Sequence, residues 1–419
     1  MSYEINAPEF RFEGFSVEWE RTYLGNLCQI GDIDHRMPES KSTGIPYLMT
    51  GDFYGINGLD FGNAKLISIE DYELLSKKIK PEFGDILFAR YASVGAVRYV
   101  ETDTKFLISY SCAILKTNNT TYGKYLFYFF QTKKAQAQFE LGINTGSQRN
   151  IGIDTLKSLS VALPKPMEQT QIGNYFQKLD TLINQHQQKH DKLSNLKNAM
   201  LEKMFPKAGE TVPEIRFDGF SGDWLDSSLL ENIESIIDFR GRTPKKLGLD
   251  WSPSGYRALS ALNVKQGYID FSVDPHFGDQ ELYERWMTGS ELHKGQVLFT
   301  TEAPMGNVAQ VPDSDKYILS QRTIAFRVKS KVITEDFLAV LLRSPKVFRE
   351  LSALASGGTA KGVSQKVLSK LTVQLPACLV EQSKIGNYFQ KLDDLINQHQ
   401  QQMTKIKNIK QACLDKMFV

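Results

Sequence analysis

The side chains that most often perform catalysis are scattered through this sequence and do not stand at the spacings that a reaction requires. Its six histidines show neither the spacing of a zinc site nor that of a nucleophile triad. The sequence contains no P-loop, no HExxH, no GxGxxG opening a helix after a strand, and no Asn/Asp-Pro-Pro-Tyr-like methylase motif. It therefore predicts no catalytic residue and no metal site in this chain.

Two short segments come nearest to a catalytic signature. Residues 357–361 include Gly357, Gly358 and Lys361, but their spacing differs from that of a phosphate-binding loop. The acidic and basic residues of 312–316 suggest a nuclease fragment, although a turn explains the same residues. We therefore expect neither segment to carry a reaction.

Long polar side chains recur at matching positions in two near-copies of one segment. Glu168–Phe205 returns as Glu381–Phe418, and 26 of the 38 aligned positions are identical. A solvated helix face tolerates most substitutions, and the segments between the copies match far less well, so recent duplication does not explain the identities. We infer a surface that is presented twice to the same kind of partner. Its principal residues are Asn174, Gln177, Lys178, Asn387, Gln390 and Lys391.

Both copies are predicted to be long helices. Apolar residues such as Ile172, Leu179 and Leu193 stand on a seven-residue ladder with no proline inside it, a period typical of a coiled-coil seam. At 1.5 Å per residue, each helix would extend about 54 Å, and the two are natural partners. His186 and His399 occupy seam positions, where a polar residue more often fixes the register than performs chemistry.

Length and composition bound the function. A chain of 419 residues, 41% of them hydrophobic, is long enough for two globular domains. The net charge of +2 excludes a polycation that coats nucleic acid, so any DNA binding must come from local loops. There is no membrane-spanning run and no signal-peptide pattern, and the four cysteines show no paired spacing. We expect a reduced, cytoplasmic protein without membrane contact.

The chain consists of two similar units. An arm at Pro8–Trp19 (PEFRFEGFSVEW) reappears at Pro213–Trp224 (PEIRFDGFSGDW), directly after the first long helix. The predicted domains are residues 1–164 (arm and first body), 165–207 (first helix), 208–376 (second arm and body) and 377–419 (second helix). This cyclic order predicts that Phe418 lies near the N-terminal arm.

The two bodies diverge but keep their landmarks in order, with most of the insertion near Leu247–Ser254. Short strands are predicted, together with one helical segment near Tyr122–Glu140 and another near Thr334–Leu354. The predicted strands are Ile86–Phe88, Ala96–Val100, Ile114–Lys116, Val297–Thr300 and Thr323–Val328. The predicted fold class is α/β (α+β): two mixed α/β bodies separated by two long antiparallel coiled-coil helices, with pseudo-two-fold symmetry.

This order of arm, variable body, lead-in and long helix, run twice, resembles the specificity subunit of Type I restriction-modification systems. The resemblance covers essentially the whole chain, and its strongest feature is the duplicated ExxxIGNYFxxLDxLI helix. The GDILF and GQVLF loops, at 84–88 and 295–299, support it. The two lead-ins that carry it contain Leu163, Pro164, Glu168 and Gln169, and Leu375, Pro376, Glu381 and Gln382.

The resemblance implies that each body is a target-recognition domain that reads one part of a split, asymmetric site in double-stranded DNA. It implies that the helices form an antiparallel pair that spaces the bodies and docks two methyltransferase subunits. It also implies that this chain has no catalytic centre and no cofactor. S-adenosylmethionine would be held by the methyltransferase subunits, and restriction (translocase/nuclease) subunits would join through the methyltransferase core.

Base reading requires long donors and acceptors on loops that enter a major groove. The candidates fall at matching places in the two bodies, so we interpret them as two clusters that face DNA, although ordinary solvated surface explains any single one equally well. A bidentate base contact by Arg90 would make Arg90→Ala cost about 1 to 3 kcal/mol and relax the preference at one base position. The candidates are Arg36, Lys41, Arg90, Tyr91, Ser93, Tyr110, Gln148 and Arg149 in the first body, and Arg240, Arg242, Lys245, Lys246, Glu302, Gln321, Arg322 and Lys361 in the second.

Two other classes of protein remain open at this point. A tethering protein would hold two partners on its coiled-coil pair without reading DNA, and charge reversal in the body loops would leave its activity intact. A nuclease or methylase with a degenerate motif would cleave or methylate DNA as the purified chain alone.

Overall fold

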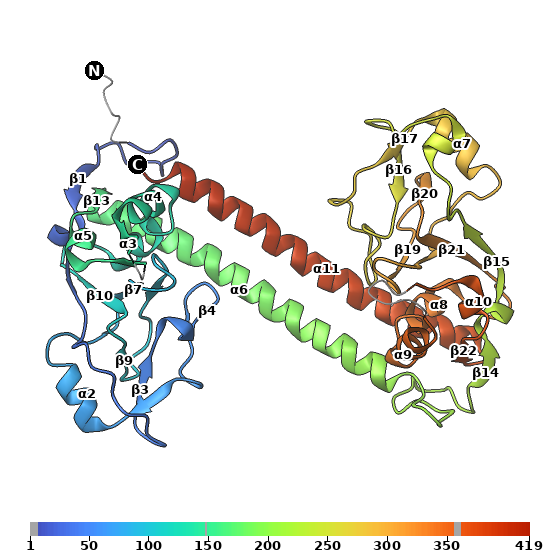
Figure 1. The fold of residues 1–419 in the computed structure, drawn as a ribbon, viewed down its shortest axis with the longest axis horizontal. Coiled ribbons are helices and arrows are strands. Elements are labelled where there is room, and N and C mark those ends of the chain that lie inside the picture. Colours follow the sequence, from blue (N-terminus) through green and yellow to red (C-terminus); the bar gives the residue numbers. More distant parts are fainter. Residues whose placement is uncertain (1–6, 147–148, 356–361) are drawn as a thin grey trace. The chain divides into compact units, whose positions relative to one another are not determined.

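The computed structural model describes residues 7–146, 149–355 and 362–419 (Figure 1). The chain divides into two compact units, one of Met1–His186 with Gln402–Val419 and the other of Gln187–Gln401. Each unit contains one body and part of both long helices. Within the described ranges, no helix is both long enough and apolar enough to cross a membrane.

The first body and its helix follow one another in an order that recurs later in the chain. The elements are β1 (Glu20–Tyr23), α1 (Leu24–Leu27), β2 (Cys28–Gly31), β3 (Ile45–Leu48), η1 (Thr50–Asp52), β4 (Phe53–Tyr54), β5 (Gly58–Leu59), β6 (Lys65–Ile67), α2 (Ile69–Leu75), β7 (Ile86–Ala89), β8 (Val97–Tyr99), β9 (Leu107–Ile108), β10 (Cys112–Thr117), α3 (Gly123–Phe129), α4 (Lys133–Gly142), β11 (Ile143–Asn144), β12 (Asn150–Ile151), α5 (Ile153–Lys157), β13 (Ser160–Leu163) and α6 (Pro166–Lys203).

The second body repeats this plan. Its elements are β14 (Leu225–Ser228), η2 (Leu229–Asn232), β15 (Ile233–Asp238), η3 (Pro244–Leu247), β16 (Tyr256–Leu259), β17 (Phe277–Gly278), α7 (Gln280–Met287), β18 (Val297–Thr300), β19 (Val308–Gln310), β20 (Tyr317–Leu319), β21 (Thr323–Val328), α8 (Glu335–Leu341), α9 (Pro345–Leu354), α10 (Gln365–Leu368), β22 (Thr372–Leu375) and α11 (Leu379–Lys416). The mixed α/β class and all five predicted strands are confirmed.

A four-stranded antiparallel sheet lies at the centre of each body, in the order β2-β10-β7-β8 in the first and β15-β21-β18-β19 in the second. Successive residues of a strand point to opposite faces. In β7, Ile86 and Phe88 therefore enter a core shared with α3 and α6, whereas Leu87 enters a second core beneath β3 and α2. In β18, Phe299 and Leu298 divide between two cores in the same way. Both faces of each central sheet are buried, which explains the continuous apolar strands.

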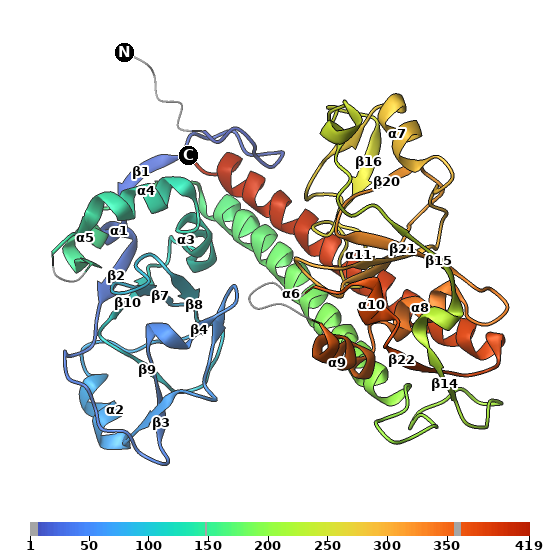
Figure 2. The same ribbon diagram turned by 45° about the vertical axis from the view of Figure 1, so that its right-hand side comes forward.

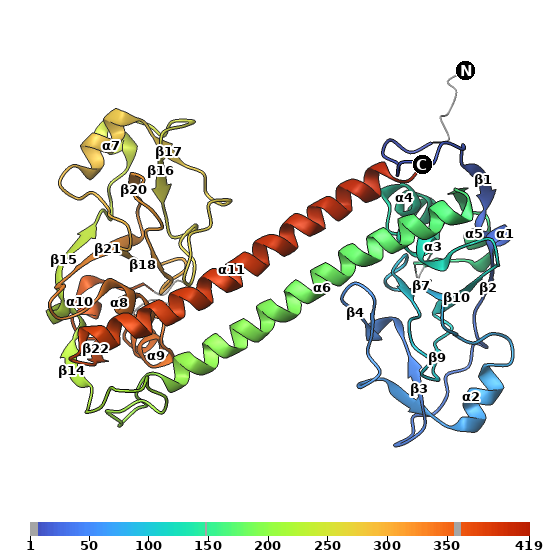
Figure 3. The same cartoon turned by 180° about the vertical axis from the view of Figure 1, so that it is seen from behind.

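A small three-stranded sheet covers the second face, in the order β6-β3-β9 in the first body and β17-β16-β20 in the second. In both, the central strand pairs antiparallel with one neighbour and parallel with the other. Figure 2 and Figure 3 show this sheet, with α2 or α7, at the end of each body opposite to the strand pair β1/β13 or β14/β22. Each body therefore has one end on its long helix and one end away from it.

The single helical segments predicted near residues 122–140 and 334–354 are wrong in one respect, because each consists of two helices. The first is broken at Thr132, whose side chain accepts a hydrogen bond from the amide of Ala135 and caps α4. The second is broken at Ser344, and α9 begins with Pro345 at its first position. A capping hydroxyl, or a proline that lacks an N–H, starts a new helix and does not continue the old one.

The predicted long helices are confirmed, and α6 and α11 each contain 38 residues. Both begin two residues earlier than Glu168 and Glu381, in the lead-in itself. In the first unit, the Asp180 carboxylate of α6 pairs with Lys410 of α11 at 2.7 Å and accepts a hydrogen bond from the Tyr128 hydroxyl at 2.9 Å. In the second unit, Asp393 of α11 pairs with Lys197 of α6 and with Arg343. Within each unit the two helix segments run antiparallel.

These two ion-pair clusters stand at corresponding positions of the sequence repeat. Asp180 corresponds to Asp393, and Lys410 corresponds to Lys197, so each helix supplies one buried acid and one base. Burial lowers the pKa of Lys197, and Asp393 opposes that shift. A buried ion left without its partner is strongly unfavourable, so both clusters constrain how the helices pair.

A buried glutamine joins each helix to its own body. Gln382 is completely buried; its Oε1 accepts from the Thr334 amide at 2.9 Å, and its Nε2 donates to the carbonyls of Val332 and Pro376 at 3.0 and 2.8 Å. Gln169 makes the same three kinds of contact in the first unit, with Tyr122, Thr120 and Pro164. The lead-in glutamines therefore satisfy backbone groups of the loop that precedes α3 or α8.

A helix glycine allows that loop to approach. A Cβ on Gly386 would lie 2.7 Å from the Asp336 carbonyl carbon, and one on Gly173 would lie 2.8 Å from the Tyr122 ring. Only glycine fits at such a distance without displacing backbone or ring atoms. The glycine of the repeated IGNYF sequence is thus required by packing.

The arms close each unit in the same way. Arg11 makes a bidentate contact with Glu168 at 2.6 and 2.7 Å, and Arg216 does so with Glu381 at 2.7 and 2.8 Å. The Phe10 amide donates to the Lys416 carbonyl at 3.0 Å, so the end of α11 lies against the N-terminal arm. The position of the chain end that the cyclic order predicted is confirmed.

Replacing Gln382 by Met tests its role, because the two side chains have similar volumes but only glutamine forms the three hydrogen bonds. We expect the free energy of unfolding to fall by about 3 kcal/mol, since unpaired buried backbone groups cost about 1 to 3 kcal/mol each. Chemical denaturation of the full chain measures the effect. Gln401→Met, at an exposed position of the same helix, is the control and should change little; equal effects of both would contradict the role given to Gln382.

Candidate nucleic-acid interface

One loop of each body has positive φ values at corresponding residues. The loop after β7 contains Ala92 with φ 56° and Gly95 with φ 88°, and the loop after β18 contains Ala303 with φ 48° and Gly306 with φ 85°. A positive φ is uncommon for a residue with a Cβ and tends to occur at functional loops. We call residues 91–95 and 302–306 the tip loops.

Each tip loop lies beside the segment that precedes α5 or α10. In the first body, Tyr91 and Asn150 form an isolated antiparallel β-bridge, and the Ile151 amide donates to the Arg90 carbonyl at 3.1 Å. In the second body, Glu302 and Gly362 form such a β-bridge, and the Val363 amide donates to the Thr301 carbonyl at 2.9 Å. The pairing of these loops explains why the candidates fall at matching places.

The structure therefore brings Tyr91 and Ser93 close in the fold to the segment that carries Arg149. Ser93 is exposed and Tyr91 half-buried, and exposed Arg149 pairs with Glu140 at 2.7 Å. Gln148 lies outside the described residues. In the second body, Lys361 also lies outside them.

Arg90 occupies a different environment from the one its sequence position indicated. Its side chain is 8% exposed, pairs with Asp32, and donates from Nε to the Ile151 carbonyl at 3.0 Å. Asp32 also pairs with Lys78 at 2.9 Å and with His35 at 3.1 Å. Burial acts to raise the pKa of Asp32, but the hydrogen bonds from Lys78 and His35 and the charge of Arg90 hold it below its usual value. The placement favours a role for Arg90 in positioning the loops over a direct contact with a base.

Of the other candidates of the first body, Arg36 and Lys41 are separate from that cluster, whereas Tyr110 contacts it through His35. Arg36 is exposed and pairs with Asp71 at 2.6 Å, and Lys41 is exposed and pairs with Glu39 at 2.9 Å. Tyr110 stacks on His35, with 4.8 Å between ring centroids and 19° between planes. These partners are surface groups that a phosphate or a base would be able to replace.

In the second body, the candidates gather around η3 and the turn after β20. Arg240 pairs with Asp238, at 2.5 Å, and the Arg242 guanidinium lies over the Phe239 ring, 4.4 Å from its centroid. Arg242 also donates to the Trp286 carbonyl at 2.8 Å.

Lys245 and Lys246 are exposed on η3, and Lys246 donates to the Gly241 carbonyl at 2.6 Å. Arg322, with φ 64°, pairs with Glu302 of the tip loop at 3.0 Å. Gln321 donates to the Arg242 carbonyl. The turn after β20 therefore links the tip loop to η3.

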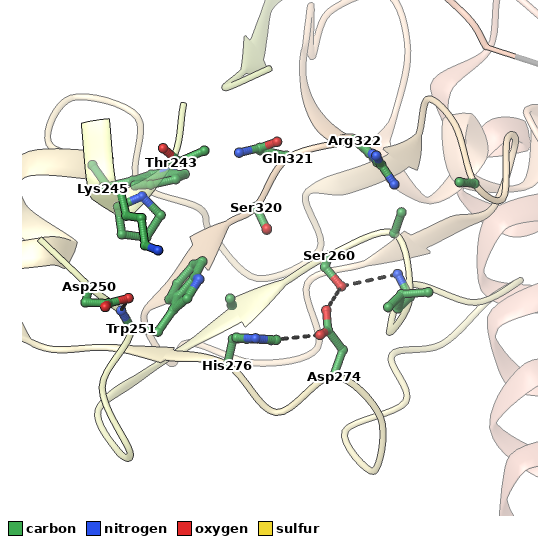
Figure 4. Close-up of a pocket in the computed structure, with 16 residues that line it drawn as sticks. Thr243, Lys245, Asp250, Trp251, Ser260, Asp274, His276, Ser320, Gln321 and Arg322 are labelled. Atoms are coloured by element: carbon green, nitrogen blue, oxygen red, sulfur yellow. Dashed lines mark hydrogen bonds and ion pairs between the residues drawn. The ribbon is translucent and has the colours of Figure 1, made fainter. Parts of the chain in front are cut away.

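A cavity of about 400 Å³ lies within this group (Figure 4). Lys245, Gln321 and Arg322 are on its lining, as are side chains that the sequence did not single out. The latter include Trp251, Ser260, Asp274, His276 and Trp286. The sequence feature that could have pointed to this lining is the insertion near 247–254, which contains Trp251 and is absent from the first body.

The repeated polar surface of the helices is largely open to solvent. Asn174, Lys178, Asn387 and Lys391 are exposed, and Gln177 and Gln390 are half-buried. Asn174 accepts a hydrogen bond from Tyr122 at 2.9 Å, and Gln177 donates to Glu101 at 2.8 Å. Gln390 donates to Asp394 on its own helix at 3.0 Å. Contacts within the described part of the chain therefore account for Asn174 and Gln177 in part, whereas Lys178 and Lys391 are exposed.

Known proteins share this architecture. A family model described as the Type I restriction modification DNA specificity domain matches the chain twice, at residues 16–195 and 236–408. The putative type I restriction enzyme MjaX specificity subunit of Methanocaldococcus jannaschii is 23% identical over 342 residues, which cover 79% of this chain and 77% of the relative. The type I restriction enzyme MjaVIII specificity subunit of the same organism is 24% identical over 301 residues, covering 70% and 68%.

A solved structure has the same fold. The crystal structure of a Type I restriction-modification system S subunit from M. genitalium matches with a TM-score of 0.64, covers 99% of both chains, and is 14% identical in sequence.

Among the described residues of the present chain, no group of three or more His, Cys, Asp or Glu side chains is arranged to hold a metal ion.

Replacing Arg90 by Ala tests the positioning role. We expect a loss of about 3 kcal/mol in the stability of the first body, because removing one partner of a buried ion pair leaves the other uncompensated. DNA affinity should fall for all sequences alike. Arg149→Ala removes an exposed arginine from a neighbouring loop and should leave the thermal unfolding midpoint unchanged. A fully stable Arg90→Ala protein with relaxed preference at one base pair would restore the base-contact hypothesis.

Proposed function

The chain belongs to the Type I restriction-modification DNA specificity family, whose members are DNA-recognition subunits with two recognition domains, and we propose that its two bodies read the two parts of a split, asymmetric DNA site. The observation that carries the proposal is the double match of one DNA-specificity domain to two bodies of the same topology. Two readers with different side chains would recognise two different half-sites.

The tip loops and the segments beside them supply the reading surface in this proposal. The two loops share positive φ values at corresponding residues, but Tyr91 and Ser93 in one correspond to Glu302 and Pro304 in the other. Direct readout depends on the donors and acceptors that such side chains present to base edges. Arg36, Lys41, Arg240 and Lys246 would contact phosphates and set the register.

The assembly that we propose contains two methyltransferase subunits on α6 and α11, bound through the exposed positions around Lys178 and Lys391. The same residues recur on both helices, which supports two equivalent docking sites for one kind of partner. Restriction subunits would join through the methyltransferase core.

Catalysis is assigned to the partners. The chain would bring no catalytic residue and no cofactor to the assembly, and S-adenosylmethionine would bind in the methyltransferase subunits. A complex that acts on cellular DNA would work in the cytoplasm. A scaffold that holds partners without reading DNA is less well supported, because the family match covers both bodies and not the helices alone.

Replacing residues 225–376 by the matching body of a relative tests whether the readers are independent. We expect one half of the recognised sequence to change and the other half to stay the same, as measured by mapping methylated sites in cells that carry the chimera with its partners. Exchange of residues 21–164 is the reciprocal control and should change the opposite half. Simultaneous change of both halves would contradict modular reading.

Native mass spectrometry of the co-expressed complex tests the stoichiometry. Two partner chains per copy of this chain are expected at saturating partner. Charge reversal at Lys178 should remove one partner, and the same change at Lys391 should remove the other, without affecting the folding of either body. A complex that saturates with one partner chain would refute two equivalent sites.

A further inference from the structure

The second body contains a recessed, partly open site that reading at the surface of a groove does not require. The cavity of about 400 Å³ is in the size range of small-molecule sites, about 300 to 1,000 Å³, and combines aromatic walls with acceptors and cations (Figure 4). We propose that it binds one nucleobase that carries an exocyclic amino group.

Two tryptophans form adjoining walls of the cavity. Trp286 is 2% exposed, and its Nε1 donates to the Leu319 carbonyl at 2.9 Å, so its ring is held in place. Trp251 lies beside it, with 6.1 Å between ring centroids and 39° between planes, and His276 lies 5.5 Å from Trp251. Aromatic walls of this kind favour a flat ring, which stacks on one of them.

Asp274 supplies the group that would recognise an amino substituent. Its carboxylate contacts His276 Nδ1 at 2.7 Å and accepts from the Ser260 hydroxyl, and both contacts hold it toward the cavity. A carboxylate has about four lone-pair positions, so two contacts leave room for another donor. Amino groups such as N4 of cytosine donate to Asp and Glu. Cytosine, adenine or guanine is therefore favoured over thymine.

The backbone around the cavity adopts unusual conformations. In the described part of the chain, four residues other than glycine have a positive φ, and three of them line this cavity: Asp274 at 49°, Ala303 at 48° and Arg322 at 64°. Ala303 shares its conformation with Ala92 of the first body, but the other two belong to the second body. Residues in such conformations cluster at ligand sites.

The position of the cavity indicates where the base comes from. Lys245, Gln321 and Arg322 on its lining are among the residues predicted to face DNA, so the expected source is a base that has left the duplex stack; this step rests on the proposed function. In the first body, His35 and Tyr110 stack on each other, and the insertion with Trp251 is absent. The proposal concerns the second body alone.

Mismatched duplexes test this source. The complex of the full chain with its methyltransferase partner is titrated with duplexes of its mapped recognition sequence, each with one base of the second half-site left unpaired by a mismatch on the opposite strand. If the base enters the cavity, the duplex that carries it mismatched should bind at least about tenfold more tightly than the paired duplex. The mismatch has already removed the base pair that extrusion would otherwise have to break. The gain should occur at one position only.

Two variants link the gain to the cavity. Asp274→Asn and Trp251→Ala should abolish it, and thermal unfolding checks that both remain folded; Trp251→Phe, which keeps an aromatic wall, should retain part of it. Asp270→Asn, in the same loop but not on the cavity lining, is the matched control and should keep the full gain.

A second experiment uses free nucleotides. AMP, CMP, GMP and TMP are titrated into the full chain while tryptophan fluorescence is recorded. Quenching by AMP, CMP or GMP that is lost in Asp274→Asn would support the nucleobase site. If no mismatch effect accompanies it, the site takes free nucleotides. Specific DNA binding with neither response would overturn the proposal and leave the DNA-reading function intact. Absence of specific DNA binding would contradict that function, and the nucleotide titration would then decide the cavity by itself.

Discussion

A carboxylate buried between two helices and a body is the interaction on which the rest of each unit depends. Asp180 and Asp393 cannot remain charged in a protein interior without partners, since the desolvation of one ion costs several kcal/mol. Lys410 satisfies the first and Lys197 the second, together with Tyr128 or Arg343 of the adjoining body. Sliding one helix past the other would separate acid from base, so each cluster fixes the helix register and the place of the body at once.

The same frame carries two different surfaces. The central sheets, the parallel strand pairs, the lead-in glutamines and the arm contacts agree between the units down to individual hydrogen bonds. The two bodies differ in the side chains that their loops expose; for example, Tyr110 in the first body corresponds to Gln321 in the second. They also differ in the insertion, which adds Trp251 to the lining of the cavity in the second body. Stability and recognition thus belong to different residues.

The sequence predicts the features that depend on periodicity and repetition. The seven-residue ladder gives α6 and α11 to within two residues at each end, and alternating or continuous apolar runs give β7, β18 and β21. The break at Thr132 is missed because a cap acts locally within an otherwise helical pattern. The break at Ser344 is missed because the apolar pattern continues past Pro345, although a proline there starts a new helix. The burial of Arg90 is missed for a different reason: a long cation on a loop looks the same in sequence whether it faces solvent or Asp32, and the partner is 58 residues away. The lining of the cavity likewise comes from segments far apart in the chain, which no local spacing reveals.

The positive-φ residues of the tip loops have a consequence for how such a protein changes over generations. Ala92 with Gly95, and Ala303 with Gly306, set the loop path by backbone conformation. Of the residues between them, Val94 and Met305 pack partly against the cores, whereas the exposed Ser93 and Pro304 contribute little to the folding free energy. Substitutions at such positions usually change stability by less than about 0.5 kcal/mol, whereas a core change costs several times more. A lineage under pressure to recognise new sequences can therefore sample them one substitution at a time and stay above the stability threshold. The backbone that restricts each loop to one shape is what makes its chemistry evolvable.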